Sequence, residues 1–256
     1  MFIDTHCHLD AAEFDPDREA VVAAASAAGV TTLVIPAVER ANFGAVASVC
    51  REYPGCVPAY GIHPMYTGDA LPEDLDALRG YLAQPGTVAI GEIGLDFFIE
   101  PHDRARQEYF FVEQLKLARE FDLPVLLHIR RAQDTILKHL RQYRVSGIAH
   151  AFSGSRSQAD EFIKLGFRLG FGGAMTHSRA TRLRELAATL PLGNIVLETD
   201  APDIPPDFLQ RGQPNKPEYL PRIAQTLAEL RGMTLEEVAC ITTENALAAL
   251  PKLKAQ

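Results

Sequence analysis

Short apolar segments rich in β-branched residues alternate with segments of helical periodicity along the chain, and this alternation constrains the fold most strongly. Eight segments have the length and composition of buried strands. They are residues 2–8, 32–37, 57–63, 88–93, 124–129, 147–151, 167–172 and 195–199. Strands that alternate with helices form a parallel sheet, because each helix returns the chain to the same edge of the sheet. The alternation therefore predicts an α/β fold with a parallel sheet.

The helical segments fix the architecture further. Apolar residues recur every three to four positions in residues 17–28, 103–121, 158–165 and 179–190. Two more helices are expected after the last strand, at 221–230 and 235–250, and the second begins with a capping box of Thr234 and Glu237. Eight strand–helix units in 256 residues predict a (β/α)8 TIM barrel that forms one domain over residues 1–256, with additional C-terminal helices. A doubly wound open sheet is the alternative, although no glycine-rich nucleotide motif follows any strand.

Composition excludes several classes of protein. No segment approaches the roughly 18 consecutive apolar residues of a membrane helix, and the first residues lack the basic and apolar parts of a signal peptide. The four cysteines are scattered without a C-x-x-C pair, which suits a reducing compartment, so we expect a cytoplasmic protein. A net charge of −8 argues against nonspecific coating of nucleic acid. A nucleic-acid substrate would have to be held locally.

Residues able to bind metal stand at the carboxyl ends of the predicted strands, where the active sites of barrel enzymes lie. His6 and His8 end the first strand, and their spacing of two points both side chains to one face. The other such residues are His63, Glu92, His128, His150 and Asp200. Each alone is explained by a hydrogen-bonded core position, but the whole set is not. Imidazole and carboxylate together suit zinc, manganese or a related divalent ion.

The number of candidate ligands indicates two metal ions rather than one. They are His6, His8, Glu92, His128, His150 and Asp200. One catalytic zinc needs only three or four protein ligands, so two divalent ions (Zn, Mn or Mg) that share a bridging carboxylate explain the surplus. Glu92 is the candidate bridge, because the fourth strand lies opposite the eighth and near the fifth around the ring. The lysines fall in helices or loops, which disfavours a carbamylated lysine as the bridge. Asp200 is expected to bind one metal and to accept a proton from the attacking water, so Asp200 and Glu92 are the candidate catalytic residues.

Basic residues and a loop near the later strands indicate an anionic substrate. Ser153 precedes the helix after the sixth strand, where free backbone N–H groups favour an anion. Arg130 and Arg131 follow His128, and an arginine can hold a phosphate in bidentate fashion. A helix cap at Ser155 and solvated arginines are the simpler alternatives. Aromatic residues that either stack bases at the rim or pack in the protein are Tyr66, Phe97 and Phe98.

Seven motifs in order resemble those of the TatD family of metal-dependent deoxyribonucleases, which belongs to the amidohydrolase-like TIM barrels. They are DTHCHLD (4–10), GIHP (61–64), GEIGLD (91–96), PVLLH (124–128), HAFSG (150–154), ETDAP (198–202) and NKPEYL (215–220). The match covers nearly the whole chain and is closest to the less characterised hydrolase branch of the family.

The resemblance implies a division of the ligands between two metal ions. One ion would be held by His6, His8, Glu92 and Asp200, and the other by Glu92, His128 and His150. His63 and Arg130 match positions that line the substrate pocket in the family. The resemblance also implies hydrolysis of phosphodiester bonds in DNA or nucleotides, starting from a 3′ end.

Three functions are consistent with the sequence. The first is a two-metal phosphodiesterase that acts on DNA or small nucleotides. The second is a hydrolase of an ester, lactone or amide, such as an aminoacyl ester on tRNA, which the acidic composition favours. The third is a metal-bound scaffold without turnover, which loss of Asp200 or of a bridging ligand would favour. We expect no membrane contact, no obligate protein partner and a monomer, because a closed barrel leaves no sheet edge to pair.

Overall fold

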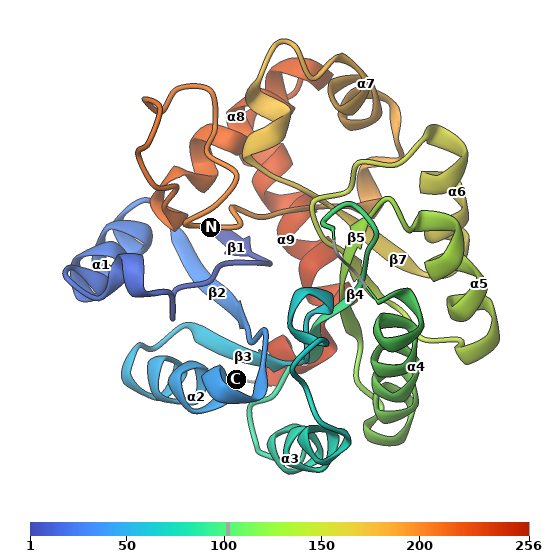
Figure 1. Ribbon diagram of the computed structural model, residues 1–256. Helices are drawn as coiled ribbons and strands as arrows, with labels where there is room; N and C mark the ends of the chain where they lie inside the picture. The colour runs from blue at the N-terminus through green and yellow to red at the C-terminus, as the bar shows by residue number, and fades with distance from the viewer. Residues whose placement is uncertain (101–102, 256) are drawn as a thin grey trace.

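Eight parallel strands form the centre of the protein (Figure 1), and the computed structural model describes residues 1–100 and 103–255. The strands are β1 (Phe2–Asp4), β2 (Val30–Pro36), β3 (Cys56–Tyr60), β4 (Ala89–Asp96), β5 (Val125–Arg130), β6 (Gly147–Ala149), β7 (Phe167–Phe171) and β8 (Ile195–Leu197). Each strand pairs in parallel with the next one along the chain.

The ring closes where β8 meets the segment after β1. The backbone N–H of Thr5 donates to the carbonyl oxygen of Leu197 at 3.1 Å, and the N–H of Asp200 donates to the carbonyl oxygen of His6 at 2.8 Å. The predicted (β/α)8 barrel is therefore confirmed, and the open sheet is excluded.

Helices surround the strands in the view along the barrel axis (Figure 1). They are α1 (Arg18–Ala27), α2 (Phe43–Glu52), α3 (Pro72–Leu82), α4 (Arg104–Phe121), α5 (Gln133–Tyr143), α6 (Arg156–Lys164), α7 (Thr181–Thr189), α8 (Leu220–Arg231) and α9 (Leu235–Ala249). The helices expected from periodicity begin and end within about two residues of α1, α4, α6, α7, α8 and α9. Within the described ranges, none of the helices has the length and apolar character needed to cross a membrane.

Apolar side chains pack in two layers, as the alternation of a strand requires. On β2, Leu33 and Ile35 belong to the outer layer between strands and helices, whereas Val34 belongs to the inner cluster. This inner cluster includes residues of seven strands and also Ala246 and Leu250. Because these last two lie on and just after α9, this helix covers the amino-terminal end of the barrel and leaves the opposite end to the loops.

A capping box at its start and the side-chain amide of Asn245 hold helix α9 in place. The Thr234 hydroxyl accepts the backbone N–H of Glu237 at 3.2 Å, and the Glu237 carboxylate accepts the N–H of Thr234 at 2.8 Å, so the predicted capping box is confirmed. The buried Asn245 side chain donates to the carbonyl oxygens of Leu192 and Ile195, at the start of β8.

Candidate metal centre

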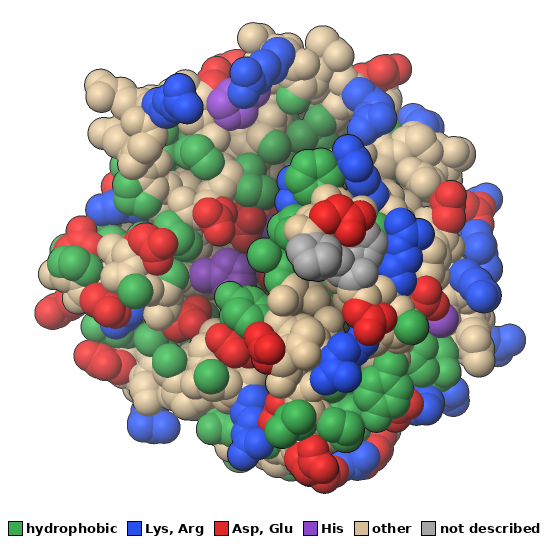
Figure 2. Space-filling view, in the orientation of Figure 1, with side chains coloured by type: hydrophobic (Ala, Val, Ile, Leu, Met, Phe, Trp, Pro, Cys, Tyr) green, Lys and Arg blue, Asp and Glu red, His purple; other side chains and the backbone are tan. Residues whose placement is uncertain are grey.

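The carboxyl ends of the strands bring the predicted ligands together in one cluster. His6 and His8 follow β1, Glu92 lies on β4, His128 lies on β5, His150 follows β6 and Asp200 follows β8. His63, which follows β3, lies in the same cluster. Figure 2 looks onto this end of the barrel and shows histidine and acidic side chains close together near the middle of the face.

Glu92 lies at the centre of the cluster and is only 3% exposed. Its Oε2 atom lies 3.3 Å from Nε2 of His6 and 3.7 Å from Nε2 of His8. Its Oε1 atom lies 3.0 Å from Nδ1 of His128 and 3.6 Å from Nε2 of His63. The two carboxylate oxygens thus face two different pairs of histidines.

Asp200 faces the cluster from the end of β8. Its Oδ1 atom lies 3.5 Å from Nε2 of His150, 3.6 Å from Nε2 of His8 and 3.7 Å from Nε2 of His6. The imidazole rings of His6 and His150 stack with their centroids 3.6 Å apart. The backbone of Asp200 has a φ of 58°, in the left-handed region that few residues other than glycine adopt. Such conformations are concentrated at functional sites.

The structure groups the ligands differently from the division that the resemblance implies. Among residues 1–100 and 103–255, three groups have ligand atoms that all lie within 4.8 Å of one another: His6 with His8 and Glu92; His6 with His150 and Asp200; His63 with Glu92 and His128. His150 therefore lies with His6 and Asp200 rather than with His128. His63, expected at the substrate pocket, lies among the ligand atoms themselves.

The donor set fits divalent cations. The Nε2 atoms of His6 and His8 face each other at 3.2 Å, beside the Glu92 carboxylate. Burial lowers the pKa of His6 and that of His63, the latter to about 3, so both rings present neutral nitrogens. Burial alone would raise the pKa of Glu92, but the adjacent histidines offset this effect and hold it well below its ordinary value. Neutral imidazole and ionised carboxylate are the forms that bind metal.

His128 and His150 differ from these two histidines in charge. Burial opposes a charge on His128, but contacts with Asp96 and Glu92 outweigh it and raise the pKa of His128 to about 9. For His150 the carboxylates of Glu198 and Asp200 likewise outweigh burial, and its pKa lies well above the ordinary value. Without a metal ion, protons on these two rings balance the surrounding carboxylates, so metal binding would release them.

Two carboxylates behind the cluster were not identified from the sequence. Asp96 Oδ2 lies 3.1 Å from Nε2 of His128, and its Oδ1 accepts the backbone N–H of Phe98 at 2.8 Å. Glu198 Oε1 lies 3.1 Å from Nδ1 of His150 and also accepts a backbone N–H from the loop after β6. Their spacing could have identified them, because residues two or four positions apart in an extended chain face the same side. Asp96 is four residues from Glu92, and Glu198 is two residues from Asp200.

Gly170 provides the space for the Glu198 carboxylate. A Cβ atom at residue 170 would lie 2.2 Å from Glu198 Oε2. Because Gly170 lies on β7, next to β8, any larger side chain there would displace Glu198 and with it the support of His150.

Asp4, on β1, connects the first strand to the segment that follows β8, next to the cluster. Its carboxylate accepts the backbone N–H of Thr199 at 2.9 Å and the Thr199 hydroxyl at 2.5 Å, as well as the N–H of His6 at 3.2 Å. Burial raises the pKa of Asp4 to about 7. Cys7 is also fully buried, in the outer apolar layer, so it points away from the ligands, as predicted.

Arg130 and Ser153, unlike His63, lie exposed beyond the cluster of candidate ligands. The guanidinium carbons of Arg130 and Arg131 lie 3.7 Å and 4.5 Å from the ring centroid of Phe98, which is 42% exposed. Ser153 is exposed on the loop that follows His150. Ser155 caps α6, because its hydroxyl accepts the backbone N–H of Gln158, which agrees with the simpler alternative for that residue.

The buried side-chain amide of Asn215 holds the long proline-rich loop after β8. The Nδ2 atom of Asn215 donates to the carbonyl oxygens of Thr199, Asp203 and Ile204 at 2.8, 3.2 and 3.3 Å. Asn215 therefore ties the far end of the loop to the segment that carries Asp200.

Comparisons with known proteins identify the family. The model of the TatD related DNase family matches residues 3–251. The chain is 42% identical over 242 residues to the uncharacterised metal-dependent hydrolase YjjV of Escherichia coli, covering 93% of each chain. The crystal structure of YjjV superposes with a TM-score of 0.93 at 40% identity and 98% coverage of both chains. The 3′-5′ ssDNA/RNA exonuclease TatD of Erwinia amylovora is 34% identical, with 96% of this chain and 98% of that protein covered. The chain therefore belongs to the TatD family of metal-dependent hydrolases.

Proposed function

We propose that this protein is a two-metal phosphodiesterase that shortens DNA from a 3′ end. The observation that carries the proposal is the position of Glu92, whose two oxygens face separate pairs of histidines. Two ions a few ångströms apart are typical of enzymes that cleave phosphodiesters. The name of the Erwinia relative, a 3′-5′ exonuclease, supports the choice of substrate and direction.

The ligands divide between two positions in this proposal. His6, His8, Glu92 and Asp200 would hold one ion, and Glu92 with His128 and a further histidine, His63 or His150, would hold the other. Zinc, manganese and magnesium are the candidate ions. When bound, they would polarise a phosphoryl oxygen and lower the pKa of the attacking water.

Asp200 is suited to accept the proton of that water. Burial would raise the pKa of Asp200, but His150, His6 and His8 outweigh it and lower the pKa, so the carboxylate is ionised at neutral pH. Its side chain keeps 14% of its surface exposed, more than that of Glu92. The carboxylate therefore faces the open end of the barrel, from which a substrate would enter.

The residues at the mouth suit a single strand of nucleic acid. Arg130 and Arg131 offer guanidinium donors for phosphate, and the half-exposed ring of Phe98 offers a surface for a base. Tyr66, 40% exposed, has its ring 6.3 Å from that of His63 and extends this rim. These contacts are local, as an overall acidic protein requires. DNA is the proposed partner, and the proposal needs neither a protein partner nor a membrane.

A nuclease assay with end-labelled strands tests the proposal. The purified protein with Mn²⁺, Mg²⁺ or Zn²⁺ is offered single-stranded DNA labelled at its 5′ end, and separately a panel of esters and lactones. We expect a metal-dependent ladder of 5′-labelled products that shorten stepwise, which is the pattern of a 3′-5′ exonuclease. Asp200→Asn should abolish the ladder, whereas Asp160→Asn, a surface aspartate paired with Arg156, should not.

Other outcomes separate the alternatives. Turnover of an ester or lactone with intact DNA would overturn the proposal in favour of the second candidate. Immediate release of the 5′-terminal nucleotide would overturn the direction of attack. Metal binding without turnover of any substrate would favour a scaffold.

A further inference from the structure

A cavity lies beside the loop that carries His150, between that loop and the start of α7. Its volume is about 300 Å³. Its wall includes Ser153 and Gly154 from the loop, Leu183 and Leu186 from α7, and the side chains of Arg179 and Arg182. The lining therefore combines apolar and basic residues.

The two arginines lack anionic partners within the described part of the chain. Arg182 donates one hydrogen bond, from Nη2 to the carbonyl oxygen of Ser153 at 3.0 Å, which fixes its guanidinium at the cavity wall. No ion pair or hydrogen bond of the Arg179 side chain is found among the described residues. Nearby arginines differ, since Arg156 pairs with Asp160 and Arg184 donates to backbone carbonyls. Arg179 and Arg182 thus keep donors available for a ligand.

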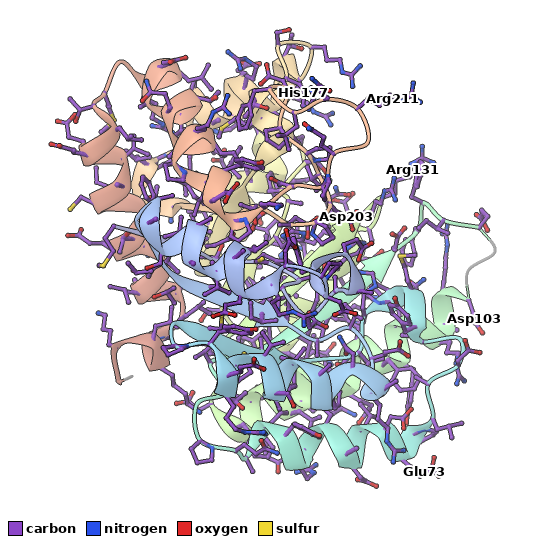
Figure 3. The ribbon with its side chains drawn as sticks, turned by 90° about the vertical axis from the view of Figure 1, so that its left-hand side faces the viewer. Glu73, Asp103, Arg131, His177, Asp203 and Arg211 are labelled. Atoms are coloured by element: carbon purple, nitrogen blue, oxygen red, sulfur yellow. The ribbon has the colours of Figure 1, made fainter. Side chains whose placement is uncertain are left out.

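The cavity lies within reach of the metal centre. Ser153 is three residues after His150, and three residues of extended chain span at most about 10 Å. In Figure 3, His177, two residues before Arg179, lies at the same end of the molecule as Arg131 and Asp203. A nucleic-acid strand whose end is at the metal centre could therefore also contact the cavity.

The distribution of charge at this end of the barrel favours a path of the nucleic-acid strand over the cavity. Figure 2 shows acidic side chains gathered over α1 at the left and Lys and Arg side chains along the right-hand side. The loop between β1 and α1 carries Glu13, Asp15 and Asp17, which would repel a phosphate backbone. The cavity lies on the other side of the mouth, beyond β6.

We propose that this cavity binds a backbone phosphate of the nucleic acid, next to the phosphate that is cleaved, through Arg179 and Arg182. This proposal rests on the proposed function. A guanidinium group matches a phosphate in charge and geometry, and a backbone contact of this kind adds affinity without sequence preference. It also explains how a protein of net charge −8 holds an anionic polymer.

The test compares substrates that do and do not reach the cavity. The variants are Arg179→Gln with Arg182→Gln together, and Arg144→Gln as a matched control. Arg144 lines a second basic cavity, of about 370 Å³, at the junction of α5 and β6 at the opposite end of the barrel. The substrates are a single-stranded decanucleotide and bis(p-nitrophenyl) phosphate, a diester with no neighbouring phosphate. Binding of a fluorescent decanucleotide by anisotropy gives a readout that does not depend on turnover.

We expect the double variant to bind the decanucleotide at least roughly tenfold more weakly, because a hydrogen bond between charged groups contributes about a factor of ten. The slope of log affinity against log salt, which is negative, should become less steep by about 0.7 for the lost phosphate contact. KM for the decanucleotide should rise in parallel, while cleavage of the small diester stays within about twofold. Arg144→Gln should change none of these quantities.

Failure of this proposal differs from failure of the proposed function. If the protein cleaves DNA and the double variant binds the decanucleotide as tightly as Arg144→Gln does, the subsite is wrong and the nuclease stands. If the protein binds the decanucleotide through these arginines but cleaves no diester, the subsite stands and the nuclease is wrong. Equal losses on both substrates would overturn the subsite, because the arginines would then act through the metal centre.

Discussion

The carboxylates of the centre make different sets of contacts. Glu92 faces two pairs of histidines, one with each oxygen. Asp96 holds His128 with one oxygen and the backbone of Phe98 with the other, so it links a ligand to the rim where substrate would lie. Glu198 uses one oxygen, Oε1, for both His150 and the backbone N–H of Ala151. Replacing one of these groups should therefore affect a different step of catalysis from replacing another.

Asp200→Asn should reduce turnover far more than metal binding. The amide keeps an oxygen that can contact a metal ion but cannot accept a proton, and general base catalysis contributes about 10²- to 10⁴-fold. We expect kcat on DNA to fall by that factor while the metal content, measured by mass spectrometry, changes little. Retention of more than about a tenth of the wild-type kcat would show that the proton goes elsewhere.

Glu198→Gln should weaken metal binding rather than turnover. The side chain keeps its shape but loses the charge that supports His150, and such changes cost roughly 10- to 100-fold in metal affinity. Activity measured against metal concentration should shift to higher concentration and reach nearly the same plateau. Glu161→Gln, on the exposed face of α6 where Glu161 pairs with Arg141 and Lys164, is the control and should leave the curve unchanged. A lower plateau with unchanged metal affinity would contradict the supporting role.

The strands position the candidate ligands, and β4 and β5 lie very close to each other at Gly94. Gly94 pairs with His128 and has a φ of 152°, which side chains rarely tolerate. A Cβ atom at residue 94 would lie 1.9 Å from the carbonyl oxygen of His128. The glycine is therefore required for the approach of two strands that carry neighbouring ligands.

Gly94→Ala should destabilise the protein and disturb the metal site together. Alanine at a positive φ with a backbone clash costs at least about 2 kcal/mol of the free energy of unfolding. Gly80→Ala is the matched control, because Gly80 is exposed in α3 and a Cβ atom there would meet nothing within 4 Å. That substitution should stabilise the protein by roughly 0.5–1 kcal/mol. Urea unfolding measures the free energy of unfolding of both variants. Equal effects of the two substitutions would show that β4 and β5 can separate without cost.

Sequence periodicity predicted the strands better than their ends. The predicted strand at 57–63 extends to His63, whereas β3 ends at Tyr60, and the first strand pairs only to Asp4 although its histidines lie further on. Single backbone hydrogen bonds continue past these ends, from the N–H of Cys7 to the carbonyl oxygen of Val34 and from the N–H of His63 to that of Val38, but the regular ladder has stopped. Hydrophobic alternation reports the extended conformation and not the pairing.

The barrel as a whole explains why the clustering of the candidate ligands was predictable and their grouping was not. Parallel strands place their carboxyl ends at one end of the molecule, so residues such as His6 and Asp200 had to meet there. Which of them touch depends on side-chain reach across a barrel whose interior is only wide enough for side chains. His150, from β6, stacks on His6 beside β1, a contact that no strand order contains.

Metal binding should stabilise the entire barrel, because its ligands come from β4, β5 and the ends of β1, β6 and β8. An ion that binds only the folded protein adds about 2.7 kcal/mol at a free concentration one hundred times its Kd. For a chain of this length we expect Tm to rise by about 5–10 °C when Zn²⁺ or Mn²⁺ is added to protein treated with EDTA. His8→Ala should lose most of this rise, whereas His139→Gln, on α5 and paired with Glu108, should keep it. A Tm that does not respond to metal in the unaltered protein would contradict a metal centre built from these strands.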